Sequence, residues 1–303
     1  MPPTWRRSRP GNPCRNRTSS TGGRRSPVRP VPAAINTERR AHIDELTARL
    51  EAPVSTATIT AQREPELLGQ TVVVIGGSAG IGLETARRAR AEGARVFLTG
   101  RNRDRLDQAA REIGVEHAAA FDANDPTHLE SFFRDLPGPI NHVMVTAGAP
   151  HYRSPLAIPP EEARHDLTEH LLLALNVARS AASKVKPTGS LIFMGGTGAR
   201  RPRPGLAIVS TVTVAFPALI ANLALELAPV RVNLIAAGFV DTPLSASLLG
   251  EDLEKRRNEL RATLPIRRVV GPAEVAALAV HIMTNTALTG ATYDIDGGQQ
   301  LVS

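Results

Sequence analysis

The chain has 303 residues, of which 42% are hydrophobic, enough for one large globular domain with a substantial core and an appendage. Its net charge of +7 originates at the N-terminus, because residues 1–37 contain eight arginines and no acidic residue. The rest of the chain therefore carries a net charge of −1, which argues against a nucleic-acid partner. The only cysteine, Cys14, excludes a disulfide framework and a cysteine-based metal site. It is typical of a reducing compartment, and we expect a cytoplasmic protein without a metal.

Residues 1–62 are expected to form a tail, followed by one domain over residues 63–303. The first 34 residues are rich in Arg, Pro, Ser and Gly and are predicted to be disordered, whereas 36–51 can form a short amphipathic helix. The tail is a basic interaction arm, a targeting segment, or upstream sequence translated from a misplaced start, which we favour. No hydrophobic signal core follows the arginines, and polar residues interrupt the most apolar stretch, 206–230. We therefore expect neither a secretory signal nor a membrane span.

Strands and helices alternate along the expected domain. Strands are predicted at 71–76, 95–99, 116–121, 142–146, 190–194, 230–235 and 291–295. Helices are predicted at 80–92, 103–113, 126–135, 160–186, 207–228 and 272–284. This alternation predicts an α/β fold with a doubly wound parallel sheet of about seven strands and helices on both faces. Segment 243–265 is expected to be mobile, and Pro217 is expected to kink its helix or delay its start.

The first predicted strand ends in a glycine-rich turn, Gly76-Gly77-Ser78-Ala79-Gly80-Ile81-Gly82, and a helix follows. Glycine at positions 76, 80 and 82 lets the backbone turn tightly and approach a pyrophosphate, while the helix N-terminus favours its negative charge. This strand–turn–helix context predicts a dinucleotide site that includes Ser78 and Ile81.

The end of the second predicted strand indicates which dinucleotide is bound. A site for NAD carries an acidic residue there to hold the ribose 2′-hydroxyl, whereas this chain has Thr99-Gly100-Arg101-Asn102. Arg101 can supply the counter-charge for a 2′-phosphate, so the sequence predicts NADP(H). The alternative is that Arg101 is a solvated loop arginine.

The turn resembles that of the short-chain dehydrogenase/reductase family, and further motifs extend the resemblance over about residues 66–303. These motifs are Ala147-Gly148, Gly238 to Thr242, Gly271-Pro272, Thr289-Gly290 and Asp296-Gly297-Gly298. The resemblance implies a single Rossmann-type domain and an association into homodimers or homotetramers through its long helices. It also implies that Asp122 accepts from the adenine amino group, that Ala147 and Gly148 make room for the adenine ribose, and that Thr242 contacts the nicotinamide carboxamide.

The catalytic positions implied by the resemblance depart from the family pattern. Serine, tyrosine and lysine are expected after the fifth strand and on the next helix, but Gly196, Val209 and Thr213 stand there. The tyrosine would relay a proton to a carbonyl oxygen with help from the lysine charge. The remaining candidates are Tyr152, on the loop after the fourth strand, and His170, at the position expected for an asparagine. The alternative for both is an ordinary loop or helix residue.

Two functions remain open from the sequence. The first is an NADP(H)-dependent oxidoreductase with a non-standard active site and an unknown small-molecule substrate. The second is an inactive NADP-binding pseudoenzyme that acts as a sensor or scaffold. The arginine-rich loop at 198–203 would either face an acidic substrate or be simply solvated.

Overall fold

The computed structural model describes residues 64–302, which form one parallel sheet covered by helices on both faces. The strands are β1 (Thr71–Ile75), β2 (Arg95–Gly100), β3 (His117–Ala120), β4 (Ile140–Val145), β5 (Val185–Gly196), β6 (Arg231–Ala237) and β7 (Thr292–Ile295). They pair in the order β3-β2-β1-β4-β5-β6-β7, and every pairing is parallel. The predicted doubly wound α/β fold with about seven strands is therefore confirmed.

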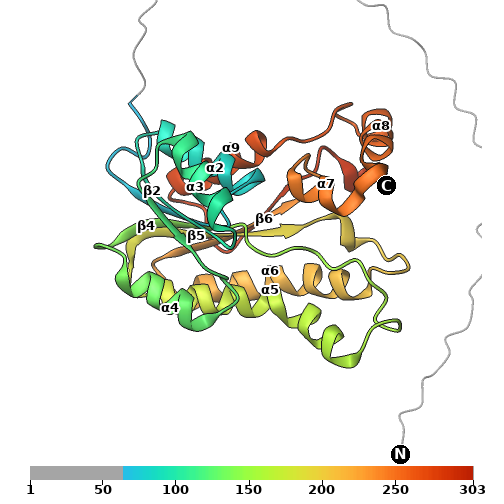
Figure 1. Cartoon of the computed structure of the whole chain (residues 1–303), viewed down its shortest axis with the longest axis horizontal. Helices are drawn as coiled ribbons and strands as arrows, with labels where there is room; N and C mark the ends of the chain where they lie inside the picture. The colour runs from blue at the N-terminus through green and yellow to red at the C-terminus, as the bar shows by residue number, and fades with distance from the viewer. Residues whose placement is uncertain (1–63, 303) are drawn as a thin grey trace, which may run out of the picture. The chain divides into compact units, whose positions relative to one another are not determined.

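The helices divide between the two faces of the sheet (Figure 1). The helices are α2 (Gly80–Ala91), α3 (Arg103–Ile113), α4 (Pro126–Asp135), α5 (Pro160–Ala181), α6 (Ala207–Glu226), α7 (Pro243–Leu249), α8 (Leu253–Thr263), α9 (Pro272–Thr284) and α10 (Gln299–Val302). One core cluster joins the sheet to α4, α5 and α6, and a second joins it to α2, α3 and α9. Between β1 and β4 the strand order changes direction, which is where such sheets bind ligands at their carboxyl edge.

Three predictions about the chain need correction. The helix predicted to reach residue 186 ends at Ala181, because the chain turns through Lys184 and Val185 already pairs with Ile140 in the sheet. Strand β5 is therefore longer than predicted at both ends. Helix α6 is continuous through Pro217, so the expected late start there is wrong.

The segment 243–265, which is expected from the sequence to be mobile, contains the helices α7 and α8. The side chain of Thr242 accepts from the amide of Ser245, and the Ser245 hydroxyl accepts from the amide of Thr242, which fixes the start of α7. Leu260 and Leu264 are buried and attach α8 to the domain. The predicted tail and its helix at 36–51 lie outside the described residues.

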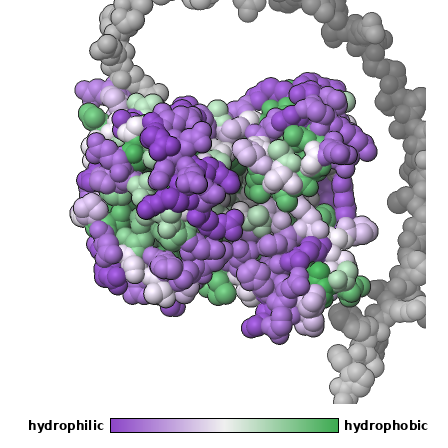
Figure 2. Space-filling view, in the orientation of Figure 1, coloured by the Kyte–Doolittle hydropathy of each residue, from purple (hydrophilic) through white to green (hydrophobic). Residues whose placement is uncertain are grey.

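Helix α6 is the one helix in residues 64–302 that is long and apolar enough to cross a membrane by length and composition. One side of it packs into the core through Ile208, Val212, Phe216, Ile220 and Leu223. This packing accounts for the apolar residues on that side, as expected for the stretch 206–230, whereas Val214 and Leu225 of the same helix are exposed. Figure 2 shows that hydrophilic side chains predominate on the visible face of the domain.

The first strand–helix turn is held to the end of β4 by Thr146. Its amide donates to the carbonyl of Ile75 at 2.8 Å, and its hydroxyl lies 3.1 Å from that carbonyl and 3.0 Å from the carbonyl of Gly76. A Cβ on Gly82 would lie 2.3 Å from the Gly76 oxygen, and one on Gly76 would lie 2.7 Å from the amide nitrogen of Ala147. The glycines at 76 and 82 are therefore required by the close packing of the protein on itself.

Replacing Thr146 by valine preserves the side-chain volume and removes the hydroxyl that bonds to the turn. Because the Gly76 carbonyl then loses this donor, we expect Thr146→Val to lower the free energy of unfolding by about 1–2 kcal/mol. Denaturant unfolding measures this change. The control is Thr263→Val on the exposed surface of α8, where little change is expected. Equal losses in both variants would show that the Thr146 hydroxyl has no special role.

Candidate functional site

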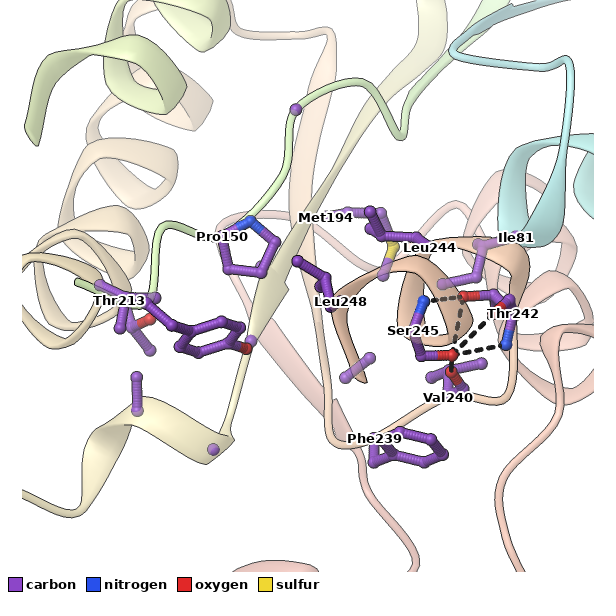
Figure 3. A pocket seen from close by; sticks show the side chains of 18 of the residues that line it. Ile81, Pro150, Met194, Thr213, Phe239, Val240, Thr242, Leu244, Ser245 and Leu248 are labelled. Atoms are coloured by element: carbon purple, nitrogen blue, oxygen red, sulfur yellow. Dashed lines mark hydrogen bonds between the residues drawn. The ribbon is translucent and has the colours of Figure 1, made fainter. Parts of the chain in front are cut away.

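A cavity of about 510 Å³ lies at the carboxyl ends of the central strands. It is lined by the first strand–helix turn, the loop after β4, the end of β5, helix α6 and the segment from β6 into α7 (Figure 3). It brings together these predicted site residues: Gly76, Gly80, Ile81, Gly82, Ala147, Gly148, Tyr152, His170, Gly196, Val209, Thr213 and Thr242. Residues implied for a cofactor and residues at the implied catalytic positions thus share one space.

The N-terminus of α2 is suited to bind a phosphate. Its cap residue is Ala79, which has no side chain able to accept from the first amides, and the first turn contains no acidic residue. Gly80 has a φ of +54°, and a Cβ there would lie 3.3 Å from the Thr242 side chain. The uncapped amides and the helix dipole favour an anion, and glycine leaves it room between the turn and Thr242.

Ser78, Arg101 and Asp122 lie outside the cavity, just beyond the carboxyl ends of the neighbouring strands β1, β2 and β3. A Cβ on Gly100 would lie 3.1 Å from the Ser78 hydroxyl, so the serine is packed against the residue preceding Arg101. Arg101 is exposed, and its guanidinium makes no hydrogen bond or ion pair with another described residue. The hydroxyl of Ser78 and the guanidinium of Arg101 are both of a kind that can donate hydrogen bonds to a 2′-phosphate. Asp122 is exposed beyond the end of β3, the next strand of the sheet.

The three positions at which the family resemblance implies catalytic groups all line the cavity. Gly196 ends β5, and Val209 and Thr213 are on α6. Glycine and valine have no proton to transfer, and a threonine carries no charge that would favour a phenolate. The three positions therefore share the cavity, and none of them carries a side chain suited to the proton relay that the resemblance implies.

Tyr152 and His170, the two candidates expected from the sequence, both line the cavity, as does His151. A Cβ on Gly148 would lie 2.8 Å from His170 Nε2, so the imidazole packs directly on the chain at the end of β4. Burial lowers the pKa of His170 below its ordinary value, although the charge of Glu169 acts in the opposite direction. Desolvation against the cavity raises the pKa of Tyr152, even though 58% of this residue is exposed. Both side chains therefore favour their neutral forms near pH 7.

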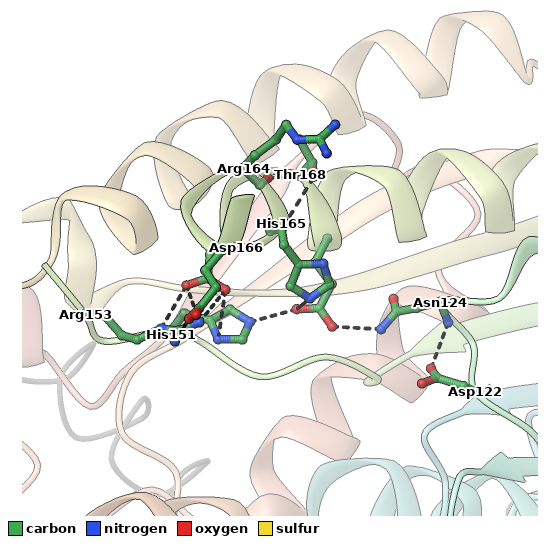
Figure 4. A network of polar contacts seen from close by, with 10 residues as sticks. Asp122, Asn124, His151, Arg153, Arg164, His165, Asp166 and Thr168 are labelled. Atoms are coloured by element: carbon green, nitrogen blue, oxygen red, sulfur yellow. Dashed lines mark hydrogen bonds and ion pairs between the residues drawn. The ribbon is translucent and has the colours of Figure 1, made fainter. Parts of the chain in front are cut away.

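Two anchors hold the loop on either side of Tyr152 (Figure 4). Arg153 donates to both carboxylate oxygens of Asp166, at 2.9 and 3.0 Å, and the Asp166 side chain is fully buried. His151 Nε2 lies 2.7 Å from Glu169 Oε2. Burial raises the pKa of Glu169, but the hydrogen bond and charge of His151 outweigh this effect, and the net pKa is lowered. The tyrosine is thus flanked by two contacts to helix α5, the Arg153–Asp166 ion pair and the hydrogen bond between His151 and Glu169.

The same network continues toward the expected adenine side. Asn124 donates from its side chain to Glu169 at 2.7 Å and from its backbone to Asp122 at 3.0 Å. The sequence analysis did not identify these partners. The sequence contained one indication of this network, the spacing of Glu162, Asp166 and Glu169. This spacing places three carboxylates along one side of a helix.

Comparison with known proteins agrees with this geometry. A family model described as enoyl-(acyl carrier protein) reductase matches residues 76–300. The short-chain dehydrogenase/reductase ATR9 of Stachybotrys chlorohalonatus is 27% identical over 254 residues, which cover 77% of this chain and 98% of ATR9. The NADP-dependent (R)-specific alcohol dehydrogenase of Lentilactobacillus kefiri is 29% identical over 248 residues, covering 77% of this chain and 97% of that protein.

A solved structure extends the comparison to three dimensions. The MalC reductase/Diels-Alderase from Malbranchea aurantiaca has a TM-score of 0.73 to this chain, with 24% identity and coverage of 78% of this chain and 99% of MalC. This likeness concerns the fold. Because the family model spans most of the chain, this protein belongs to the short-chain dehydrogenase/reductase family, whose members bind a nicotinamide cofactor.

Proposed function

We propose that this protein is an NADP(H)-dependent oxidoreductase with a non-standard proton donor. The observation that carries the proposal is the single cavity in which the uncapped N-terminus of α2 and Thr242 lie with Tyr152 and His170. A nicotinamide cofactor supplies or accepts a hydride. The protein's own contribution is to bind this cofactor, enclose the substrate between β5, α6 and α7, and manage the accompanying proton.

The preference for NADP(H) rests on the edge of the sheet beyond the cavity. An exposed guanidinium without an internal partner, beside the hydroxyl of Ser78, suits a 2′-phosphate. The described residues at the end of β2 include no acid to hold an unmodified ribose, because Gly100, Arg101 and Asn102 follow Thr99. The NADP-dependent relative from Lentilactobacillus kefiri also supports this choice.

The proton chemistry sets the range of substrates. A neutral His170 and a Tyr152 with a raised pKa are weaker acids near neutral pH than an unshifted imidazolium or a lysine-assisted phenol. We therefore propose acceptors that do not require a protonated oxygen, or slow reduction of ordinary carbonyls with His170 or Tyr152 as donor.

The cofactor preference predicts the effect of removing the guanidinium at the end of β2. We expect Arg101→Ala to weaken NADPH binding by about 1.5–3 kcal/mol and to leave NADH binding unchanged, because only NADPH carries the 2′-phosphate. Fluorescence titration with both cofactors measures this. Arg105→Ala, an exposed arginine in the first turn of α3, is the matched control. Equal affinities for the two cofactors in the unmodified protein would contradict the proposal.

The missing relay predicts weak turnover of simple ketones and aldehydes with NADPH. General acid–base catalysis typically raises a reaction rate by about 10²–10⁴-fold. We therefore expect turnover to be slower by about this factor than in a relative that retains the tyrosine and lysine. If His170 donates the proton, its lowered pKa makes the rate rise as the pH falls from about 8 to about 6, because only the protonated imidazole is an effective acid. Steady-state rates across this range test both statements.

Variants identify the donor in the same assay. His170→Ala should abolish the rise at low pH, Tyr152→Phe should lower a pH-independent rate, and His281→Ala on the exposed surface of α9 should do neither. Robust turnover that survives both of the first two substitutions would show that neither side chain is the donor. Tight NADPH binding without any turnover would favour the alternative function, a pseudoenzyme that acts as a sensor or scaffold.

We also propose that the protein assembles as a homodimer or homotetramer through α5 and α6. Large apolar side chains are exposed on both helices: Leu172 and Leu175 on α5, and Val214 and Leu225 on α6. Burying them between copies would remove apolar surface from water. Light scattering should give a mass at least twice that of the 32.3 kDa chain, and a monomer at micromolar concentration would refute assembly. A cytoplasmic location, suggested by the single cysteine, remains a prediction that cell fractionation can test.

A further inference from the structure

The loop after β5 presents one arginine to the cavity without a partner. Arg200 donates to both carboxylate oxygens of Asp294, at 2.7 and 2.8 Å, and Arg201 donates to the backbone carbonyl of Gln300. Arg203 lines the cavity and is exposed, and its guanidinium forms no hydrogen bond or ion pair within residues 64–302. This exposed side chain is therefore an unpaired positive charge in the cavity wall.

Helix α8 provides a second cation. Arg257 is held by Asp241, at 2.6 Å, and by Glu254, which fixes it away from other partners. Arg256 lines the cavity, and its only ion pair with a described residue is a 3.3 Å contact with Glu259 one turn along the same helix. Both side chains of that pair are partly exposed, so the pair is weak and leaves Arg256 available to a ligand.

The acidic side chain in the cavity wall does not offset these charges. Asp166 is fully buried, and both of its carboxylate oxygens are bound by Arg153. Arg153 is shared with Glu162, and among the charged residues that line the cavity two arginines, Arg203 and Arg256, outnumber the one aspartate.

The wall between these arginines and the end of β5 is apolar. Leu244 and Leu248 of α7 line the cavity (Figure 3), with 44% and 46% of their surface exposed. Val209 of α6 lines the same cavity. Covering such large apolar side chains with a ligand removes apolar surface from water, which lowers the free energy of the complex. The wall therefore suits an apolar body.

We propose that the substrate is an amphipathic anion, with an apolar body against α6 and α7 and a carboxylate or phosphate group paired with Arg203 and Arg256. The inference rests on the proposed function, because it names the substrate class of the same cavity. The pairing places the charged end at the solvent side and the apolar body along the wall that ends at Gly196.

The two arginines are not needed to bind the phosphates of the cofactor. The uncapped amides that suit the pyrophosphate belong to the N-terminus of α2, and the site for the 2′-phosphate lies beyond β2 at Arg101. Arg203 and Arg256 belong instead to the loop after β5 and to α8. Their substitution should therefore leave NADPH affinity unchanged.

Calorimetric titration of the NADPH-loaded full-length protein with three ten-carbon probes tests the proposal: decanoate, decanol and decyltrimethylammonium. Decanoate should bind about tenfold or more tightly than decanol, and the cationic probe should bind most weakly. Arg203→Ala and Arg256→Ala should each weaken decanoate binding about three- to tenfold, without affecting decanol. Higher ionic strength should weaken decanoate binding only.

Matched variants separate a specific site from general attraction. Lys255→Ala removes the same charge from an exposed position of α8 outside the cavity and should have no effect, whereas Arg203→Lys should preserve most of the affinity. Equal binding of decanoate and decanol, an equal loss in Lys255→Ala, or a comparable loss of NADPH affinity in Arg203→Ala would overturn the proposal. Absence of NADPH binding with selective decanoate binding would overturn the proposed function, and the amphipathic anion would then be a ligand of the cavity and not a substrate.

Discussion

The attachment of the first turn to β4 is the constraint on which the site depends. Ile75 accepts from the amides of both Thr146 and Ala147, and the Thr146 hydroxyl reaches the next carbonyl. The turn can approach β4 this closely only because Gly76 and Gly82 have no side chain. This close packing of the turn on β4 fixes the direction of α2. It thereby fixes the direction of the first amides of α2, which suit a phosphate.

The hydrogen bonds of this attachment involve none of the three positions at which the family resemblance implies catalytic groups. The sheet is not disturbed by Gly196, Val209 and Thr213 at these positions, because they lie on β5 and α6 and make no contact that holds the turn. Loss of the relay therefore need not cost the fold or the cofactor site. In the proposed function the proton chemistry depends on the loop after β4, where Arg153 pairs with Asp166 and His151 contacts Glu169 on either side of Tyr152.

The parts of the structure that the sequence predicted are those set by local chemistry. The turn at Gly76 to Gly82 and the end of β2 at Arg101 could be read because a few consecutive residues determine them. Helix α7 was missed because its cap pairs Thr242 with Ser245, where the usual signal has a glutamate or glutamine. The network of Arg153, Asp166 and Glu169 was missed because its partners come from a loop and a helix, and no sequence period records how the loop folds back.

The distribution of arginine partners shows why charge counts alone could not distinguish Arg203 from its neighbours. The loop from 198 to 203 contains three arginines in the sequence, and nothing local distinguishes them. In the fold, Arg200 is used to hold Asp294, near the C-terminus of the chain, and Arg201 to hold the backbone of Gln300. Only Arg203 remains for an external anion among the three. Because a charge that already has a partner contributes little to recognition, the function of each arginine follows from what the fold places beside it.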